Sequence, residues 1–487
     1  MRFIQIVFFL ILFSCSNSNS ETEHTSSEGS SANSGVISTD GVDVPIMGGP
    51  AHIEMSINNA PDAKSYLIAS VAGSNFRMDS TEIKAGKLEL KKADGYPQGL
   101  YYFSLPNKQY VQFFLAEDQE FKMQFDANDM TGSMQVSGSK ENEIFYQNLK
   151  FEADYNTQYQ AVLKEMAPYV EKTGAAYEAL DKKKRALEKS RQDHLESLYK
   201  GNEGLLFVSF KKAGQNPVIR EELPNDQKVY FYRKEFWDNV DFSDRRLIRT
   251  PVVSNKLKRY IKELTPQNGD SLVKYSSVLI DKTLPYPEYF KYISNWIAIE
   301  YDSGKTTLMD PEKIFVHLTQ NYFTRERAFW ADSMEVFALQ QRAGEMAQSL
   351  VGLQGPDVVS TDENGNTQSI YSKTADYIVV YMYNPTCEHC MKETPQLVEW
   401  YKKNKNSGVD VFAIAIDTDK NEWTDYIEKN GMEFTNVFDP TNESIYAKYY
   451  VNVTPEIYLL NKERKIIAKN LKVFQIDEMI NRDRSGQ

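Results

Sequence analysis

The chain has 487 residues, of which 41% are hydrophobic and 25% are charged, and it contains 30 Tyr and 26 Phe. This composition is ordinary for a globular protein, and the length suggests about three domains. The net charge of −12 argues against nucleic acid as a partner, because phosphate binding requires a basic surface.

Residues 1–14 predict an export signal. Met1 and Arg2 give the segment a positive start, and residues 3–13 form an apolar run broken by a single glutamine. The run is too short to cross a bilayer as a helix and fits the apolar part of a secretory signal. No later segment is apolar enough to cross a membrane.

Residues 12–15 read Leu-Phe-Ser-Cys and resemble the bacterial lipobox. The resemblance implies that the signal is cut before Cys15 and that this cysteine carries lipid. An ordinary signal peptide with an incidental cysteine is the alternative. Residues 15–40 are largely polar and predict a disordered tether between the anchor and the folded body.

Residues 41–140 show the alternation of apolar and polar side chains that is typical of β-strands. The pattern occurs in the runs 52–57, 66–69, 76–78, 86–90, 101–105, 110–115, 121–125 and 134–136. Turn-forming residues such as those at 94–97 separate the runs. Short strands at this spacing predict an antiparallel β-sandwich or barrel.

Residues 141–350 predict an all-α domain. Apolar side chains recur there at steps of three and four, as in Tyr155, Tyr159, Val162, Met166 and Tyr169. The segment 236–244 is aromatic and acidic together. It fits either a partner surface or a packed connection between helices, and the packed connection is favoured.

Residues 352–487 alternate strands with helices. The runs 377–383 and 409–416 are continuously apolar, which is typical of strands covered on both faces. Further strands are predicted at 434–438, 457–460 and 465–468, and helices at 387–403 and 421–430. This alternation implies an α/β fold with a parallel core. A turn at 362–366 predicts a hairpin ahead of it.

Two cysteines lie where the first of these strands passes into a helix. Residues 383–390 read Tyr-Asn-Pro-Thr-Cys-Glu-His-Cys, so Cys387 stands at the helix start and Cys390 one turn further. Unpaired N–H groups and the helix dipole favour a thiolate at Cys387. We expect Cys387 to attack a client disulfide and the more buried Cys390 to resolve the mixed disulfide.

Thr454-Pro455 and the Cys-x-x-Cys-x-x-Glu-x-Pro pattern completed by Glu393 and Pro395 give the cysteines a family context. With them, residues 352–487 resemble the thioredoxin superfamily, specifically the membrane-anchored TlpA/ResA-type oxidoreductases of bacteria. The resemblance implies a cis-proline at Pro455 beside the cysteines and a client-binding role for Thr454. It makes Glu393 a candidate proton acceptor near the second cysteine, and we expect Pro395 to bend the helix.

The upstream part resembles, more loosely, extensions that carry this module in lipoproteins of Bacteroidota. The motif itself departs from the family at three places. Thr386 replaces the usual Trp, and Tyr381 falls near the buried Asp of thioredoxin, so that proton relay is absent. Glu388 should disfavour a thiolate by like charge, whereas protonated His389 should favour it. The direction of the redox reaction therefore stays open, and the relatives favour reduction.

These features predict a lipid-anchored thiol–disulfide oxidoreductase of the cell envelope, periplasmic and attached to a membrane. No bound cofactor is expected, because the dithiol itself carries two electrons. The expected partners are disulfide-containing exported client proteins and an upstream membrane electron donor.

Three other interpretations compete. Cys387, His389 and Cys390 suit zinc or copper, but no later His or Cys completes the ligand set. Residues 385–387 are a fragment of the peroxiredoxin signature, whose full Pro-x-x-x-Thr-x-x-Cys spacing is missing. The serious alternative is a binding or scaffolding lipoprotein with an accessory thioredoxin-like domain, because residues 41–350 have no assigned task.

Overall fold

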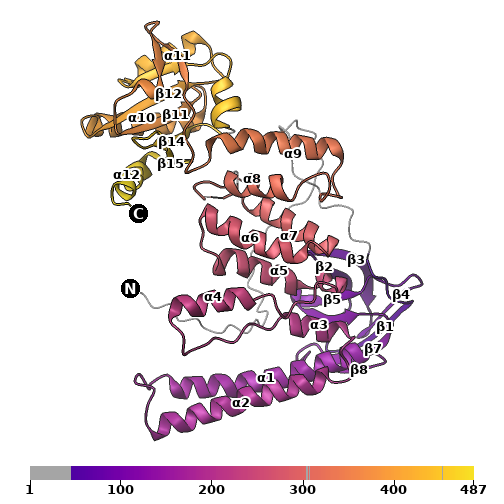
Figure 1. Cartoon of the computed structure of the whole chain (residues 1–487). Coiled ribbons are helices and arrows are strands. Elements are labelled where there is room, and N and C mark those ends of the chain that lie inside the picture. The colour runs from indigo at the N-terminus through magenta and orange to yellow at the C-terminus, as the bar shows by residue number, and fades with distance from the viewer. Residues whose placement is uncertain (1–44, 303–304, 307, 452, 487) are drawn as a thin grey trace. The chain divides into compact units, whose positions relative to one another are not determined.

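A computed structural model of the chain describes residues 45–302, 305–306, 308–451 and 453–486 (Figure 1). The predicted signal, the lipidation site Cys15 and the tether up to residue 40 lie outside these described residues. A β-rich region, a helical region and an α/β region follow one another along the chain, as the sequence predicts. None of the helices in the described part combines the length and the hydropathy needed to cross a bilayer.

The β-rich region consists of two four-stranded sheets, with the orders β4-β1-β7-β8 and β3-β2-β5-β6. Its strands are β1 (Ala51–Asn58), β2 (Ala63–Val71), β3 (Ser74–Ile83), β4 (Lys87–Lys92), β5 (Gly99–Ser104), β6 (Tyr110–Leu115), β7 (Gln119–Asp126) and β8 (Gln135–Ser137). Buried side chains from both sheets belong to one core, as in a sandwich.

The predicted sandwich is confirmed, with one departure from antiparallel pairing. Strands β1 and β7 run parallel over their whole length, from Ala51 opposite Gln119 to Asn58 opposite Asp126. No hairpin can join two parallel strands, and the chain passes through the second sheet between them. Each buries alternate residues, so the apolar period of two is preserved on both.

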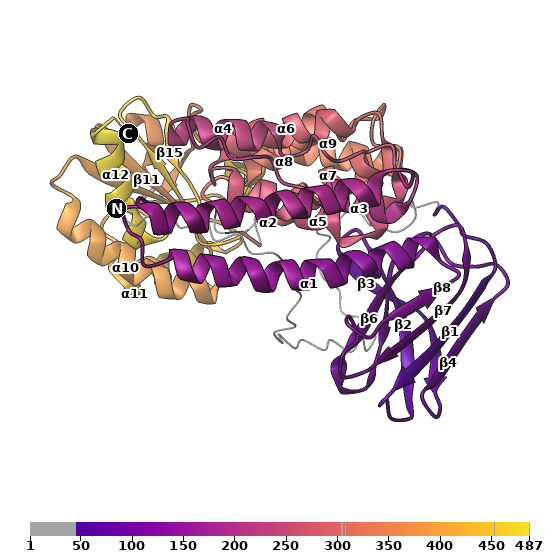
Figure 2. The same cartoon turned by 90° about the horizontal axis from the view of Figure 1, so that it is seen from below.

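The helical region has nine α-helices in its described part. They are α1 (Lys140–Met166), α2 (Ala175–Tyr199), α3 (Leu206–Ala213), α4 (Asn225–Glu235), α5 (Pro251–Lys258), α6 (Gly269–Thr283), α7 (Pro287–Glu300), α8 (Glu312–Asn321) and α9 (Ser333–Met346). Helices α1 and α2 lie side by side (Figure 2), and Arg191 pairs with Glu152 at 2.8 Å between them. Phe236, Trp237 and Phe242 are buried, so their segment is the packed connection that was favoured.

The C-terminal region is built on a seven-stranded sheet of order β10-β9-β13-β12-β11-β14-β15. The strands are β9 (Val359–Asp362), β10 (Thr367–Ser369), β11 (Tyr377–Tyr383), β12 (Val409–Ala415), β13 (Thr435–Phe438), β14 (Glu456–Leu460) and β15 (Ile466–Ala468). Its helices are α10 (Glu388–Asn404), α11 (Lys420–Asn430) and α12 (Ile476–Arg484). The predicted parallel core is β11, β12 and β13, and β9 and β10 form the predicted hairpin.

Strand β11 is buried along its whole length, which explains its unbroken apolar sequence. Its residues alternate between two separate cores. Val379, Tyr381 and Tyr383 enter the core that also contains Cys390, whereas Ile378, Val380 and Met382 enter the core on the other side of the sheet. The strand therefore places three tyrosines, Tyr377, Tyr381 and Tyr383, on the side of the sheet that holds the cysteines.

Candidate active site

Cys387 is the residue immediately before α10. Its backbone is extended, with φ −74° and ψ 123°, and the helix begins at Glu388. The backbone N–H groups of His389 and Cys390 belong to the first helical turn and donate to its sulfur. The sulfur therefore lies at the positive end of the helix dipole, as the sequence predicts.

The protonation of Cys387 depends on its contact with Thr454. As a thiol, Cys387 donates through Sγ to the carbonyl oxygen of Thr454 at 3.2 Å. Partial burial raises the pKa of Cys387, but hydrogen bonds from the Thr454 side chain and from the N–H groups of Cys390 and His389 outweigh it and leave the pKa below its ordinary value. The thiolate, which is the nucleophile, is favoured at this position.

Cys390 has the opposite environment. Its side chain is fully buried, and burial raises its pKa to about 12, with the neighbouring Cys387 adding to the rise. A hydrogen bond from the backbone of Asn384 acts in the other direction. Both cysteines are free thiols, and their sulfurs are close enough to share a hydrogen bond. One sulfur is accessible and easily ionised, and the other is enclosed and protonated.

The loop before the helix is held by Asn384. Its side-chain oxygen accepts from the backbone N and the hydroxyl of Thr386, both at 2.7 Å. Its side-chain nitrogen donates to the carbonyl of Asp417 at 3.0 Å, and its own carbonyl accepts from the N–H of Cys387 at 3.1 Å. These bonds fix the path of the chain into the first cysteine.

Thr454 and Pro455 reach the site from the other end of the domain. They immediately precede β14, which pairs antiparallel with β11, and the peptide bond between them is cis. The pairing brings the Thr454 carbonyl to the Cys387 sulfur, although 67 positions separate the two residues.

Two protein families match parts of the chain. Residues 351–469 match the AhpC/TSA family, and residues 51–145 match a domain of unknown function, DUF4369. The first match covers the sheet, both cysteines and the cis-proline. The C-terminal domain is thioredoxin-like.

Curated and solved relatives match parts of the chain. The thiol-disulfide oxidoreductase ResA of Bacillus subtilis (strain 168) is 27% identical over 116 residues, which are 24% of this chain and 64% of that protein. A thioredoxin-like protein from Bacteroides caccae is 21% identical with a TM-score of 0.47, and the match covers 55% of this chain and 98% of that one. A domain of a possible thiol-disulfide isomerase from Cytophaga hutchinsonii is 30% identical with a TM-score of 0.27. That match covers 29% of this chain and 97% of the Cytophaga domain.

The other predicted site residues of the thioredoxin-like domain differ in their exposure and in their contacts. Glu388 and His389 are exposed at the helix start, with their side chains in solvent. Glu393 is half-buried, and its carboxylate accepts from the N–H of Val473 at 2.8 Å. This bond ties α10 to the chain ahead of α12, so Glu393 has a structural task, and proton transfer by it stays a prediction. Pro395 lies inside α10, which continues to Asn404.

Sequence reasoning missed two features of the site. One is Asn384, whose bonds to Thr386 and Asp417 position the loop. The other is a set of hydroxyl groups from Tyr381, Thr394 and Tyr426 in the core that contains Cys390. A polar residue three positions before the first cysteine, and a Thr four residues after the second, were the available signals.

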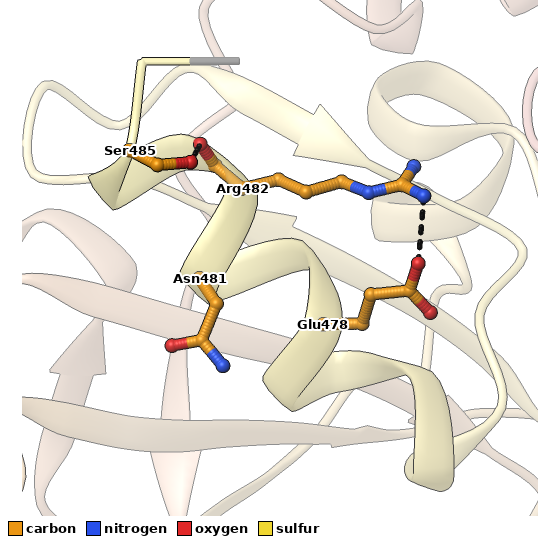
Figure 3. A pocket seen from close by; sticks show the side chains of 4 residues that line it. All are labelled: Glu478, Asn481, Arg482 and Ser485. Atoms are coloured by element: carbon orange, nitrogen blue, oxygen red, sulfur yellow. Dashed lines mark hydrogen bonds and ion pairs between the residues drawn. The ribbon is translucent and has the colours of Figure 1, made fainter. Parts of the chain in front are cut away.

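A surface pocket elsewhere in the thioredoxin-like domain is separate from this site (Figure 3). It is lined by Glu478, Asn481, Arg482 and Ser485 of α12 and the residue after it, and Arg482 pairs with Glu478 at 2.7 Å. All four residues are exposed, and none of the candidate site residues lines the pocket.

Proposed function

We propose that this chain is an extracytoplasmic thiol–disulfide oxidoreductase. The observation that supports the proposal is the asymmetry of its cysteines. Cys387 is partly exposed and has a lowered pKa. Cys390 lies one helical turn further along the chain, is buried, and has a pKa of about 12. Such a pair suits attack by the first sulfur and resolution by the second.

The proposed reaction reduces a client disulfide. The Cys387 thiolate attacks one client sulfur, and the other client sulfur leaves and takes a proton. Cys390 then loses its proton and attacks Cys387, which releases the second client sulfur. The client gains two electrons and two protons, and the chain retains a Cys387–Cys390 disulfide. The resemblance to TlpA/ResA-type proteins supports this direction, and a membrane electron donor would restore the dithiol.

Clients would be disulfide-containing exported proteins that dock beside the accessible sulfur. The family resemblance assigns the docking role to Thr454 and Pro455. The Thr454 carbonyl oxygen lies 3.2 Å from the Cys387 sulfur, and the cis peptide bond to Pro455 follows it directly. Glu388 and His389 would tune the reaction from the solvent side with opposite charges. Because both side chains are exposed, salt should weaken their effect.

The β-rich and helical regions would position the thioredoxin-like domain or select its clients. Their buried side chains form one continuous core, which runs from Ala51 to Leu339. A single core of this kind supports a common task for the two regions. A binding or scaffolding protein with an accessory redox domain remains the outcome if the activity test fails.

The first test is reduction of insulin disulfides by the full chain with dithiothreitol. We expect wild type to accelerate the reaction and Cys387→Ser to abolish the acceleration. We also expect Cys390→Ala to capture cell-envelope proteins as mixed disulfides, and the Cys387→Ser/Cys390→Ala double variant to capture none. Two unreactive thiols and no acceleration would favour the scaffolding function instead.

Anchoring is proposed through lipid on Cys15, because residues 12–15 resemble a lipobox. A single acyl chain gives only weak membrane binding, so stable anchoring needs either a second acyl chain on the same cysteine or another membrane-binding segment. The test is fractionation of cells that express wild type or Cys15→Ser. We expect wild type in the membrane fraction with incorporated fatty acid, and the variant without lipid. Equal fatty-acid labelling of both would contradict lipidation at this residue.

A further inference from the structure

Three hydroxyl groups from three different elements meet in the core of the thioredoxin-like domain. Thr394 of α10 lies at their centre, with its Oγ1 2.7 Å from the hydroxyl of Tyr381 and 2.9 Å from the hydroxyl of Tyr426. Tyr381 belongs to β11 and Tyr426 to α11. Tyr381 and Thr394 are fully buried, and Tyr426 is 7% exposed. We call these three residues the hydroxyl triad.

The hydroxyl triad lies next to the resolving cysteine. Thr394 follows Cys390 by four residues on α10, so both side chains lie on the same face of the helix. Tyr381, Tyr426 and Cys390 belong to one buried core. Burial is the main reason that the pKa of both tyrosines is raised, and a negative charge on Cys390 raises it further. The two tyrosines and the sulfur therefore share one enclosed, largely apolar environment.

Ring stacking holds the two tyrosines of the triad in place. Tyr383 lies between them, with its ring centroid 5.3 Å from that of Tyr381 and 5.4 Å from that of Tyr426. The ring planes differ by 10° and 28°, so all three rings are nearly parallel. A packed stack of this kind leaves the hydroxyl groups little freedom to turn away.

The hydroxyl triad has one proton that its internal hydrogen bonds do not use. Three hydroxyl groups carry three protons, and the two hydrogen bonds among them use two. Tyr426 donates to Thr394. If Thr394 in turn donates to Tyr381, the proton of Tyr381 is available to a further acceptor. A raised pKa keeps that proton on Tyr381 throughout the physiological range, so the group acts as a donor and never as a base.

A buried thiolate needs such a donor. During resolution Cys390 must become negative where its side chain is fully buried, and burial raises its pKa although the Asn384 backbone and the Thr454 side chain already offer it hydrogen bonds. We propose that Tyr381, held by Thr394 and Tyr426, donates a hydrogen bond to the Cys390 thiolate and so stabilises the nucleophile of the resolving step. This inference rests on the proposed function and names the group that stabilises its buried nucleophile.

The step balances without consuming the triad. Cys390 gives up its proton, and its thiolate forms the new bond to the Cys387 sulfur. The bond between Cys387 and the client sulfur breaks, and the client sulfur leaves with the electron pair and takes a proton from solvent. Tyr381 keeps its own proton, and its hydrogen bond strengthens only while Cys390 carries charge.

The test uses the full chain and a chromogenic disulfide, 5,5′-dithiobis(2-nitrobenzoate). Attack by Cys387 releases one coloured thiolate in a first phase, and attack by Cys390 on the resulting mixed disulfide releases a second in a later phase. Tyr381→Phe should slow the second phase about tenfold near neutral pH and raise its pH midpoint by about one unit, because it removes one hydrogen bond to a charged group. The first phase should not change.

Tyr401→Phe is the matched control. Its hydroxyl bonds to Asp410 at 3.3 Å in the same domain, and neither residue belongs to the triad. Both phases of Tyr401→Phe should equal those of wild type. If Tyr381→Phe does not fold, Thr394→Val, which removes the group that orients Tyr381, should show the same shift of the second phase.

The outcomes separate this inference from the function on which it rests. A second phase with an unchanged rate and pH midpoint in folded Tyr381→Phe, or in folded Thr394→Val if that variant has to be used, overturns the role of the triad. Loss of both phases in wild type overturns the proposed function itself. A purely structural hydroxyl network would lower the thermal stability of the variant and leave the pH midpoint where it is in wild type.

Discussion

The Sγ atom of Cys387 lies 3.2 Å from the carbonyl oxygen of Thr454. This contact joins the start of α10 to the start of β14, and the Thr454 side chain also contributes a hydrogen bond that lowers the pKa of Cys387. One residue thus contacts the reactive sulfur through both its backbone and its hydroxyl group. The reactivity of Cys387 is consequently sensitive to a single side chain outside the Cys-x-x-Cys motif.

Thr454→Val should raise the pKa of Cys387. The variant keeps the shape and the backbone carbonyl but loses the hydroxyl that stabilises the thiolate, so alkylation should require a higher pH than in wild type. The measurement is the rate of alkylation by iodoacetamide as a function of pH. Thr424→Val is the control, because its hydroxyl bonds within α11, to the carbonyl of Lys420 at 3.0 Å, and the variant should keep the wild-type midpoint. An equal midpoint in Thr454→Val and wild type would contradict the assignment.

The two cysteines of the reduced protein should differ strongly in their reaction with iodoacetamide. A thiol ionises only when the pH approaches its pKa, which lies below the ordinary value for Cys387 and at about 12 for Cys390. At about pH 7 we expect one adduct, on Cys387. Peptide mass mapping identifies the site, and Cys387→Ser should remain unlabelled for the same time. Labelling of both residues at similar rates would exclude the predicted asymmetry.

The stability of the folded chain should fall as the pH rises through about 8. Burial raises the pKa of Glu456 to about 8, with Lys469 acting against the rise and Glu312 and Asp310 adding to it. The folded-state pKa is above the unfolded value, so this contribution to stability is complete below the unfolded pKa and is lost progressively as the pH rises from there to the folded pKa. Glu456→Gln should remove an effect on the order of 1–3 kcal/mol.

The measurement is the free energy of unfolding by urea between about pH 5 and pH 9. Glu399→Gln serves as the control, because this carboxylate is exposed on α10 and pairs with Lys403. We expect the control to follow the pH dependence of wild type. A Glu456→Gln curve that is parallel to wild type at every pH would show that Glu456 does not ionise in this range.

Asn384→Ala should loosen the loop that leads into Cys387. The variant loses the bonds to Thr386 and Asp417, and we expect a loss of about 1–2 kcal/mol in the free energy of unfolding. The rate of insulin reduction should fall further than the stability alone implies, because the position of the sulfur becomes less defined. Unchanged stability and rate together would mean that the neighbouring backbone holds the loop by itself.

Much of the site could be predicted from local sequence. Tyr377–Tyr383 was expected as a buried strand from its unbroken apolar run, and Cys387 was expected at the start of the helix that follows. The parallel pairing of β1 with β7 was not predicted, because no short sequence signal links strands that lie so far apart in the chain. The predicted period of two was nevertheless correct on both strands.

The hydroxyl triad illustrates a second limit. Tyr381 is 13 positions from Thr394, and Tyr426 is 32 positions from it. In the sequence each is an ordinary core residue, and the comparison with thioredoxin indicated only that a carboxylate was missing at Tyr381. The contact between the hydroxyl groups follows from the packing of β11, α10 and α11 against one another, which no single stretch of sequence encodes.

The enclosure of Cys390 also bears on oxidative damage. Peroxide converts an accessible thiolate to a sulfenic acid, and a second equivalent makes the change irreversible. At this site only Cys387 is accessible to the oxidant. The buried thiol of Cys390 lies one helical turn away. Condensation of the two would expel water and leave the ordinary disulfide, so the chain should survive peroxide exposure in a form that a thiol reductant can restore.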